Sequence, residues 1–220
     1  MFAKQLITDD IIPLKTSNTG AYALNWMDEN KVSHLPIVND VEFLGLISDE
    51  DIFEFNNFDE ALGSHKLSLV SPFVYEDQHL FEIIKIIAEH KLTLVPVLDY
   101  QNRYLGAITS QSLIQSLSKI VSVEHPGGII VLEVSNNDYS LSQIAQIVES
   151  SDAKILSLYI TSETDSTKIE IAMKINTFEI ASILQTFDRY NYFVKASYAD
   201  KNDIDDLKDR YDSFMNYLNI

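Results

Sequence analysis

The chain contains no cysteine among its 220 residues. Disulfide bonds, thiol catalysis and cysteine-based zinc or iron–sulfur centres are therefore excluded, and a reducing compartment is expected. No apolar run approaches the roughly 18–20 residues that a membrane span needs. The first ten residues, MFAKQLITDD, lack the basic and apolar segments of a signal peptide. We therefore expect a cytoplasmic protein with no membrane segment.

Basic residues are scarce, with 16 Lys and Arg against 33 Asp and Glu, which gives a formal net charge of −17. A field of this sign repels phosphate backbones and anionic lipids. The lysines are scattered and form no basic patch. We therefore expect binding neither to nucleic acid nor to a membrane surface, and we interpret the acidity as an aid to solubility.

The motifs of common catalytic centres are also missing. The five histidines form no HxxxH or HExxH metal spacing, and the chain has no GxSxG, GxxxxGK[ST] or GxGxxG sequence. The acidic runs lack the spacing and the glycine of a calcium loop. We therefore expect no catalytic residue, no metal ion, no cofactor and no enzymatic activity.

One element occurs twice in the first part of the chain. HLPIVNDVEFLGLISDEDIFEF, which starts at His34, aligns with LVPVLDYQNRYLGAITSQSLIQSL, which starts at Leu94. The alignment places Pro36 on Pro96 and Gly45 on Gly106, with an offset of 60 residues that becomes 61 after a turn. Such an internal repeat predicts two copies of one structural unit, at about residues 1–60 and 61–122.

Each copy has the pattern of a helix, two short strands and a second helix. The helices are expected at about residues 19–29 and 80–90, and the strands at 35–38, 43–47, 94–98 and 104–108. The second helix of each copy is expected to begin at a hydroxyl residue, Ser48 or Thr109.

The stretch GLISDED, Gly45 to Asp51, has two readings. Ser48 and Asp51 are spaced as a helix cap, with the hydroxyl at the N-cap and the carboxylate three residues later. The same geometry can also form a pocket in which free amides bind an anion and a carboxylate accepts hydrogen bonds from ribose hydroxyls. The second copy, GAITSQS, carries Ser112 in place of the acid.

The paired motifs, VSHLPIVND with GLISDED and LTLVPVLDY with GAITSQS, resemble those of a tandem CBS (cystathionine-β-synthase-type) domain pair, also called a Bateman module. The resemblance covers about residues 1–122. It implies a mixed α/β (α+β) module that binds an adenosine-containing ligand in the clefts between its repeats.

Carried over to this sequence, the resemblance implies one intact site and one degenerate site. In the intact site Ser48 faces the phosphate or ribose, Asp51 holds the ribose hydroxyls, and an adenine pocket is lined by Val32, Ser33, His34 and Pro36 above Ile11 or Ile12. The degenerate site comprises Thr93, Leu94, Pro96, Thr109 and Ser112.

Charge narrows the ligand class. Asp49 and Glu50 flank Ser48, and only Lys31 and His34 are nearby cations in sequence. We therefore expect a monophosphate such as AMP, a nucleoside or an adenosyl sulfonium compound rather than free ATP.

The stretch SVEHPGG, from Ser122 to Gly128, marks a domain boundary. Beyond it, residues 126–220 show a βαββαβ order, which is ferredoxin-like. The strands are expected at 128–135, 153–161, 167–175 and 192–199, and the helices at 140–150 and 178–190.

This second domain resembles an ACT-type regulatory domain. The turn after its first strand, SNNDYS, has Asp138 but lacks the glycine that is frequent in that family. Self-association and amino-acid binding therefore both stay open as roles. The tail from Asn202 to Ile220 has the pattern of an amphipathic helix that packs on this domain or on a dimer partner.

Two functions remain. One is a regulatory module that binds an adenosine-containing ligand and modulates a separate, unidentified protein or its own homodimer. The other is a dimerisation scaffold whose clefts bind nothing.

Overall fold

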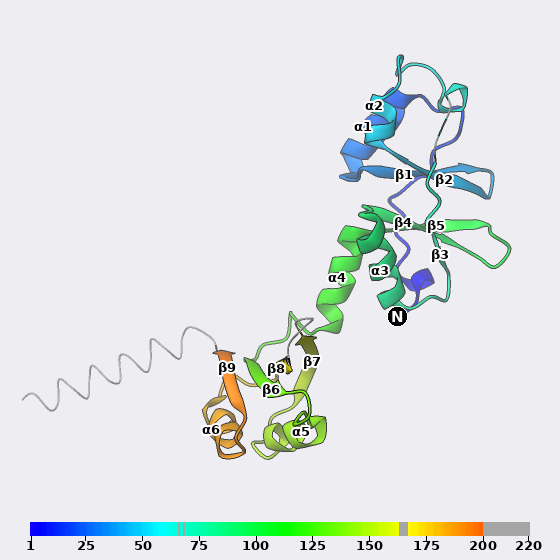
Figure 1. Ribbon diagram of the computed structural model, residues 1–220. Helices are drawn as coiled ribbons and strands as arrows, with labels where there is room; N and C mark the ends of the chain where they lie inside the picture. Colours follow the sequence, from blue (N-terminus) through cyan, green and yellow to red (C-terminus); the bar gives the residue numbers. More distant parts are fainter. Residues whose placement is uncertain (66, 68, 163–166, 200–220) are drawn as a thin grey trace, which may run out of the picture. The chain divides into compact units, whose positions relative to one another are not determined.

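The computed structural model describes residues 1–65, 67, 69–162 and 167–199 (Figure 1). The chain divides into two compact units between Ser116 and Leu117. Among the described residues, no helix has the length and apolar character needed to cross a bilayer. The amphipathic tail expected at 202–220 lies outside the described residues.

The first unit contains the expected helix–strand–strand–helix order twice. Its elements are η1 (Ala3–Gln5), α1 (Gly20–Asn30), β1 (His34–Asn39), β2 (Glu42–Ser48), α2 (Asp49–Phe53), η2 (Leu62–Ser64), β3 (Val74–Tyr75), α3 (Leu80–His90), β4 (Leu94–Leu98), β5 (Tyr104–Thr109) and α4 (Ser110–Ile120, which continues past the unit boundary). The short strand β3 and the two 3₁₀ turns were not expected from the sequence.

The two copies end their first helices in the same way. Helix α1 stops at Lys31 with φ of 54°, and α3 stops at Lys91 with φ of 52°. A left-handed residue at this position lets its amide bond back to the last helical carbonyls. The matching ends show that the repeat extends to backbone geometry.

Each hairpin contains a glycine where another part of the chain comes close. A Cβ on Gly45, at φ of 149°, would lie 2.6 Å from the Cβ of Leu69. A Cβ on Gly106, at φ of 153°, would lie 2.4 Å from Ile7 Cγ2. The glycines are needed both for the backbone angle and for the close approach.

The segments that approach these glycines are exchanged between the repeats. The amide of Leu46 in the first repeat donates to the Val70 carbonyl at 2.8 Å, and Val70 lies in the chain that leads into β3 of the second repeat. The amide of Thr8, near the N-terminus, donates to Ala107 of the second repeat at 3.0 Å. Each repeat is therefore completed by the chain that leads into the other.

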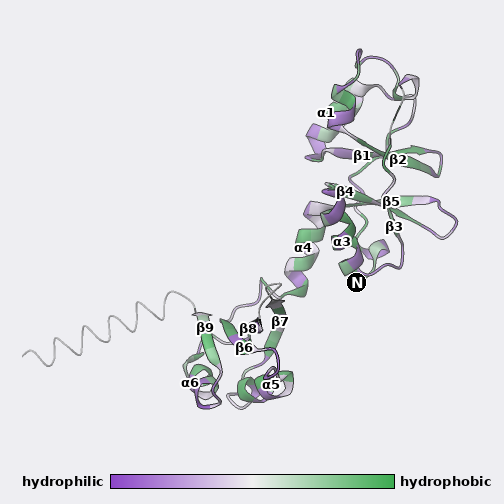
Figure 2. Cartoon of the chain, in the orientation of Figure 1, coloured by the Kyte–Doolittle hydropathy of each residue, from purple (hydrophilic) through white to green (hydrophobic). Residues whose placement is uncertain are grey.

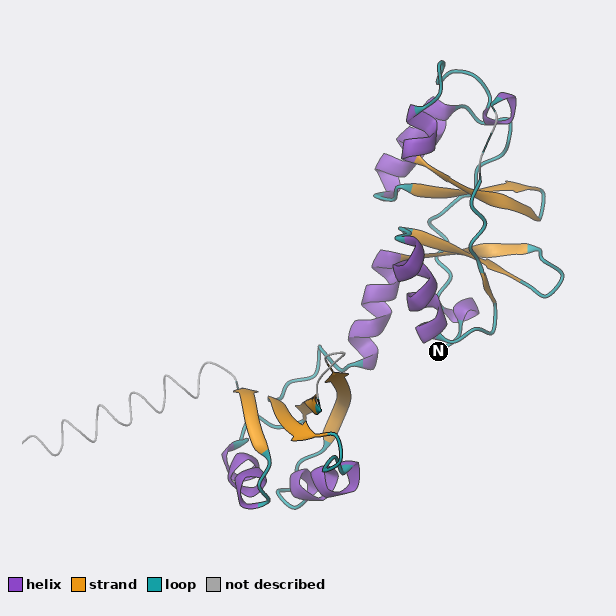
Figure 3. Cartoon of the chain, viewed as in Figure 1, coloured by secondary structure: helices purple, strands orange, loops and turns teal. Residues whose placement is uncertain are grey.

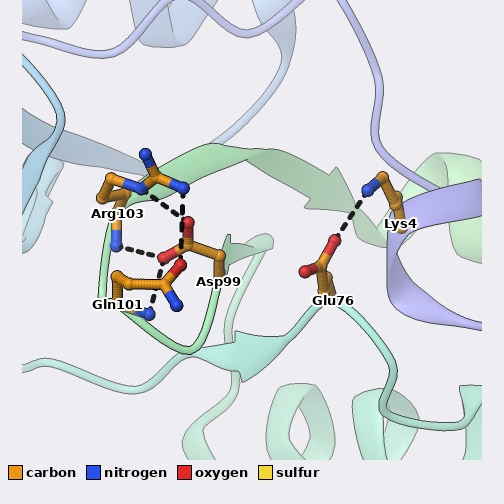
Figure 4. A network of polar contacts seen from close by, with 5 residues as sticks. All are labelled: Lys4, Glu76, Asp99, Gln101 and Arg103. Carbon is orange, nitrogen blue, oxygen red and sulfur yellow. Dashed lines mark hydrogen bonds and ion pairs between the residues drawn. The ribbon is translucent and has the colours of Figure 1, made fainter.

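Polar contacts support this exchange on the second repeat (Figure 4). Lys4 Nζ donates to Glu76 Oε2 at 2.8 Å, and the Lys4 amide donates to the Glu76 carbonyl at 2.9 Å.

A separate set of hydrogen bonds closes the turn between β4 and β5. The buried carboxylate of Asp99 accepts bonds from the amides of Gln101 and Arg103 and from Arg103 Nε. Burial opposes ionisation, yet the Arg103 and Gln101 bonds hold the pKa of Asp99 below its ordinary value.

The second unit has a four-stranded antiparallel sheet in the order β7-β8-β6-β9. Its elements are β6 (Ile129–Ser135), α5 (Leu141–Glu149), β7 (Ile155–Ser162), β8 (Lys168–Ile175), α6 (Ala181–Arg189) and β9 (Phe193–Tyr198). Both helices lie on one face of the sheet (Figure 3). This confirms the ferredoxin-like fold.

The core of the second unit lies between that sheet and its helices. Ser140 caps α5, since its hydroxyl accepts from the Gln143 amide at 3.4 Å. Helix α5 carries hydrophobic and hydrophilic residues together (Figure 2), and its Ile144, Ile147 and Val148 are buried in the core. The helical spacing of apolar residues indicates Ile144 and Val148 as buried, whereas Leu141, which has the same spacing, is 50% exposed at the start of the helix.

Candidate functional site

The start of α2 is closed by a reciprocal pair of hydrogen bonds between Ser48 and Asp51. The Asp51 amide donates to Ser48 Oγ at 3.1 Å, and the Ser48 amide donates to Asp51 Oδ2 at 2.8 Å. The Ser48 hydroxyl also donates to Asp51 Oδ2, at 2.6 Å. The capping interpretation of GLISDED is therefore realised in full.

The second repeat caps its helix without a carboxylate. The Ser112 amide donates to Thr109 Oγ1 at 3.1 Å, as at the first helix, but the Ser112 hydroxyl donates to the Thr109 carbonyl at 2.9 Å. The short side chain is thus turned back onto its own backbone. It presents no acceptor comparable to the Asp51 carboxylate.

Asp51 also borders a pocket of about 220 Å³ in the first unit. Its Oδ2 is bonded to Ser48, while its Oδ1 has no hydrogen bond to any described residue. The pocket is lined by Ile47, Asp51, Glu54, Phe55, Asn56, His65, Leu67 and Leu69. A carboxylate oxygen beside apolar and aromatic surface can accept hydrogen bonds from a small polar ligand.

An aromatic stack forms one wall of this pocket. The rings of Phe55 and His65 lie parallel with centroids 3.9 Å apart. His65 Nε2 is buried and has no hydrogen-bond partner within the described part of the chain, with Glu60 Oε2 at 3.8 Å. A ligand that forms a hydrogen bond with this nitrogen would satisfy a buried polar atom that has no partner among the described residues.

Asp51 is the one member of the sequence-derived set that borders this pocket; Ser48 caps the helix beside it. Ile11 and Val32 are buried, and Pro36 lies inside β1. Ile12 is 56% exposed, and its carbonyl accepts from Trp26 Nε1 at 3.2 Å. The nearby cation Lys31 is paired with Asp28 at 3.0 Å.

Ser33 and His34 of the first repeat instead meet Thr93 of the second. Thr93 Oγ1 accepts from the Ser33 amide at 3.0 Å and lies 3.1 Å from His34 Nδ1. The Thr93 amide donates to the same Nδ1 at 3.4 Å, so Nδ1 is an acceptor and the Thr93 hydroxyl donates to it. Residues expected in two separate sites are therefore joined in one inter-repeat contact.

Burial sets the charge state of His34. It lowers the pKa of the imidazole below its ordinary value of 6.5, although the carboxylates of Asp49, Asp51 and Glu50 act in the opposite direction. A neutral ring is also what the acceptor role of Nδ1 requires. Burial and hydrogen bonding thus favour the same protonation state.

The inter-repeat contact extends to both capped helices. The Asp49 amide, in the first turn of α2, donates to the Ser33 carbonyl at 3.1 Å. The Ser110 amide, in the first turn of α4, donates to the Thr93 carbonyl at 2.9 Å. One continuous set of hydrogen bonds therefore links the starts of the two motif helices.

The pocket residues that sequence reasoning missed are Ile47 of β2, three residues that follow α2 and three residues that precede β3. Glu54, Phe55 and Asn56 follow the motif, and His65, Leu67 and Leu69 lie between α2 and β3. The signal that could have found them is Gly45, whose missing side chain makes room for Leu69. A motif glycine indicates a close neighbour but does not say which segment supplies it.

The turn after β6 borders a second pocket, of about 410 Å³. Asp138, Gln143 and Tyr192 lie in its wall, and the Tyr192 hydroxyl donates to Gln143 Oε1 at 2.7 Å. Burial, with the nearby Asp138 charge, raises the pKa of Tyr192. No group of three or more His, Asp or Glu side chains is arranged for a metal ion in the described part of the chain.

Comparison with known proteins identifies the family to which the two repeats belong. Residues 3–56 and 70–119 match the family model of the CBS domain. The chain carries a tandem pair of CBS domains. This confirms the expected repeat, and the CBS pair is the unit that holds both capped helices.

The curated proteins that are similar to part of this chain include the following two. A CBS domain-containing protein of Dictyostelium discoideum is 28% identical over an alignment of 141 positions, and the match covers 57% of this chain and 97% of the relative. A homoserine O-acetyltransferase of Methanosarcina acetivorans is 24% identical over 123 residues, 51% of this chain. The match spans only 22% of that enzyme.

Solved structures are also similar to part of this chain. A CBS domain pair/ACT domain protein from Thermotoga maritima is 23% identical, with 54% of this chain and 98% of that chain covered and a TM-score of 0.48. CBSX2, solved in complex with AMP, is 21% identical, with 54% of this chain and 97% of that chain covered and a TM-score of 0.47.

Proposed function

We propose that the CBS pair is a regulatory module that binds an adenosine-containing ligand at the first motif helix. The observation that carries this proposal is the position of Asp51, whose carboxylate borders a pocket with one oxygen open to a ligand. A carboxylate accepts hydrogen bonds from both hydroxyls of a ribose. Phe55 and the stacked His65 ring offer flat surfaces to a purine.

The other residues of the first site serve as its frame. Ser48 holds the Asp51 carboxylate through two hydrogen bonds, from its amide and its hydroxyl, and is proposed to face a phosphate or ribose oxygen. Val32, Ser33, His34 and Pro36, with Ile11 and Ile12, are the remaining residues proposed for ligand contact. AMP, a nucleoside or an adenosyl sulfonium compound is favoured over free ATP because Asp49 and Glu50 lie beside the motif.

The second repeat is proposed as a degenerate site. Thr93, Leu94, Pro96, Thr109 and Ser112 occupy the equivalent positions, but Ser112 offers a hydroxyl where the first repeat offers a carboxylate. The loss of a charge-assisted hydrogen bond costs roughly 1.5–3 kcal/mol, or about one to two decades in affinity.

Regulation would act on a separate protein or on a homodimer of this chain in the cytoplasm. The ferredoxin-like unit, which we propose to be ACT-like, supplies self-association. A ligand changes such an assembly only if it binds one of two arrangements more tightly than the other. No catalytic role is proposed: the described residues that line the pocket include no Ser, Thr or Lys beside a general base.

A scaffold with empty clefts is the second candidate. It is favoured by the Ser48–Asp51 bonds, which give both residues a complete structural role as a helix cap. On this reading the pair of CBS domains and the ferredoxin-like unit hold a dimer together without a ligand.

The experiment that separates the two is a thermal-shift series with AMP, ADP, ATP with and without Mg²⁺, adenosine and S-adenosylmethionine. Binding to the folded state adds about 2.7 kcal/mol at a hundredfold excess over Kd. We expect one ligand to stabilise the wild type and Ser112→Ala but not Asp51→Ala. Stabilisation by MgATP above that by AMP would contradict the proposed ligand class, and a flat series would favour the scaffold.

A further inference from the structure

Helices α5 and α6 cover the same face of the four-stranded sheet, which leaves the other, open face without a described helix (Figure 3). An antiparallel sheet commonly turns polar side chains to water on a face of this kind. Here the register of the strands brings apolar side chains together on it instead. The open face is therefore a candidate surface for another element.

A row of apolar side chains crosses the open face from one edge strand to the other. It consists of Tyr159 in β7, Ala172 in β8, Val131 in β6 and Ala196 in β9, which are paired in that order. Val131 alternates along β6 with the core residues Ile130 and Leu132. Because successive residues of a strand point to opposite sides, the row faces away from the core.

Three aromatic side chains on the edge strands stand exposed on this face. Tyr159 is 56% exposed, Phe193 is 63% exposed and Tyr198 is 61% exposed. Phe193 and Tyr198 of β9 pair with Glu133 and Ile129, each of which neighbours a core residue of β6 and so points away from the core. Apolar side chains that gather on one exposed face commonly mark a surface that another segment covers.

The charges on the open face favour an acidic segment. The four strands carry three lysines against two glutamates, although the chain as a whole carries −17. Both glutamates are paired with lysines, in the ion pairs Glu133–Lys168 and Glu170–Lys195. Lys174 Nζ donates to the Gly127 carbonyl at 2.7 Å and has no carboxylate partner within the described part of the chain.

The tail of the same chain, from Asn202 to Ile220, has the composition that such a face requires. Its apolar residues recur at helical spacing, at Ile204, Leu207, Tyr211, Phe214, Met215 and Leu218. Its other positions include five aspartates against one lysine and one arginine. An apolar stripe bordered by acidic residues therefore complements an apolar row bordered by lysines.

We propose that the tail packs as an amphipathic helix on the open face of the sheet in its own chain. Three residues separate Asn202 from Tyr198, which ends β9 on that face. A helix over residues 202–220 is about 28 Å long, whereas four strands spaced by about 4.8 Å are about 14 Å across. The tail is therefore long enough to cross from β9 to β7.

The short connection favours the tail of the same chain over that of a second copy. A segment tethered by a few residues has an effective concentration in the millimolar range, far above that of a second chain at micromolar concentration. The net charge of −17 also makes two copies repel each other. Packing of the tail is independent of any ligand at the CBS pair.

Hydrogen exchange of the full chain, followed by mass spectrometry, tests whether the tail is packed. A single helix rich in aspartate and asparagine is unstable in water on its own. Packing should therefore slow exchange of the amides of residues 204–218 by about tenfold or more. Tail amides that exchange at the rate of an unstructured peptide in the wild type would overturn the proposal.

Matched variants of the second unit locate the contact. Tyr159→Asp sets a carboxylate against the acidic tail and should remove most of the protection. Leu141→Asp changes a residue of α5 that is 50% exposed on the other side of the sheet, and it should leave the protection intact. Protection of the tail that Tyr159→Asp leaves unchanged would contradict the assigned face.

Variants of the tail give the same comparison without altering the sheet. Phe214→Ser shortens the apolar stripe and should lower the protection, whereas Ser213→Ala, on the opposite side of the helix, should not. This pair decides the question if Tyr159→Asp fails to unfold cooperatively. Equal protection in both tail variants would contradict a packed apolar stripe.

Disulfide crosslinking shows whether the tail covers its own sheet or that of a second copy. About ten helical residues span the distance from β9 to β7, which brings Phe214 near Tyr159. The chain has no cysteine, so Tyr159→Cys with Phe214→Cys introduces its only thiols, and oxidation should link them within one chain. Leu141→Cys with Phe214→Cys should stay unlinked. A product with the mass of two chains would overturn the proposal and place the tail on a second copy.

Discussion

The hydroxyl of Thr93 accepts a hydrogen bond from the backbone amide of Ser33, which is its own counterpart in the other repeat, at 3.0 Å. A second contact of this kind joins the hairpins, where Glu42 forms an isolated bridge with its counterpart Arg103. Contacts between equivalent residues occur where two copies meet across an approximate two-fold axis. The two CBS repeats therefore face each other symmetrically, with Thr93 at the centre.

Thr93→Val should destabilise the CBS pair. The substitution keeps the shape of the side chain but leaves the Ser33 amide and His34 Nδ1 without the hydroxyl. A buried group that loses its partner costs about 1–3 kcal/mol. Urea unfolding of the full chain measures the change. Thr93→Ser, which keeps the hydroxyl, should recover most of the loss, and equal loss in both variants would contradict the hydrogen-bond account.

Gly45→Ala and Gly106→Ala should both destabilise the chain, but for different reasons that a second substitution separates. The new Cβ at Gly106 meets the Cγ2 of Ile7, whereas at Gly45 it meets the Cβ of Leu69 and the Val70 carbonyl, at 2.6 and 3.1 Å. Each single substitution should cost about 1–3 kcal/mol through overpacking.

The double variants provide the control. Ile7→Ala removes the obstructing Cγ2 and should lessen the cost of Gly106→Ala. Leu69→Ala keeps the obstructing Cβ and should not lessen the cost of Gly45→Ala. Thermal unfolding of the wild type, the four single variants and the two double variants measures the coupling in each pair. Equal rescue at both glycines would contradict the contacts seen in the structure.

The repeat and the capped helices could be predicted because their causes are local. The spacing of Pro36, Gly45 and Ser48 recurs at Pro96, Gly106 and Thr109, and local hydrogen bonds define each cap. The second unit was predictable for the same reason, since its strands and helices alternate with clear periodicity.

The arrangement of the candidate site could not be predicted, because it depends on contacts between distant segments. Leu69 approaches Gly45, and Thr93 bonds to Ser33, across 24 and 60 positions of sequence. The sequence placed Ser33 and His34 beside Ser48, and the structure has His34 opposite Ser48 in the β1–β2 hairpin; the added contact of both residues with Thr93 of the other repeat was not predicted. Periodicity indicates which face of an element is buried but not which element covers it.

Exchange of the motif residues tests the asymmetry of the two repeats. Ser112→Asp should let the second helix form the reciprocal cap seen at Ser48 and Asp51, with a stabilisation of about 0.3–1 kcal/mol from the carboxylate in the first turn. Asp51→Ser should lose a similar amount. Urea unfolding of the two variants and the wild type gives both values. Stabilisation by Asp51→Ser would contradict the assigned cap.

The free energy of unfolding should depend on pH through His34. Because burial holds the pKa of His34 below 6.5 in the folded state, the unfolded chain takes up a proton first as the pH falls. Stability is therefore highest above about pH 6.5, and it declines below that value until the folded state is protonated as well. Protonation would also end the acceptor role of Nδ1 toward Thr93, while the nearby Asp49, Glu50 and Asp51 carboxylates limit the shift.

His34→Leu, which copies Leu94 at the equivalent position of the second repeat, should remove this decline. Urea unfolding between pH 7.5 and 5 gives the free energy of unfolding of the wild type and of the variant at each pH. Subtracting one from the other cancels the titration of the groups that both proteins share. The difference in unfolding free energy should change steadily below pH 6.5 in favour of the variant. A difference that stays constant over the whole range would show that His34 titrates alike in the folded and unfolded chain.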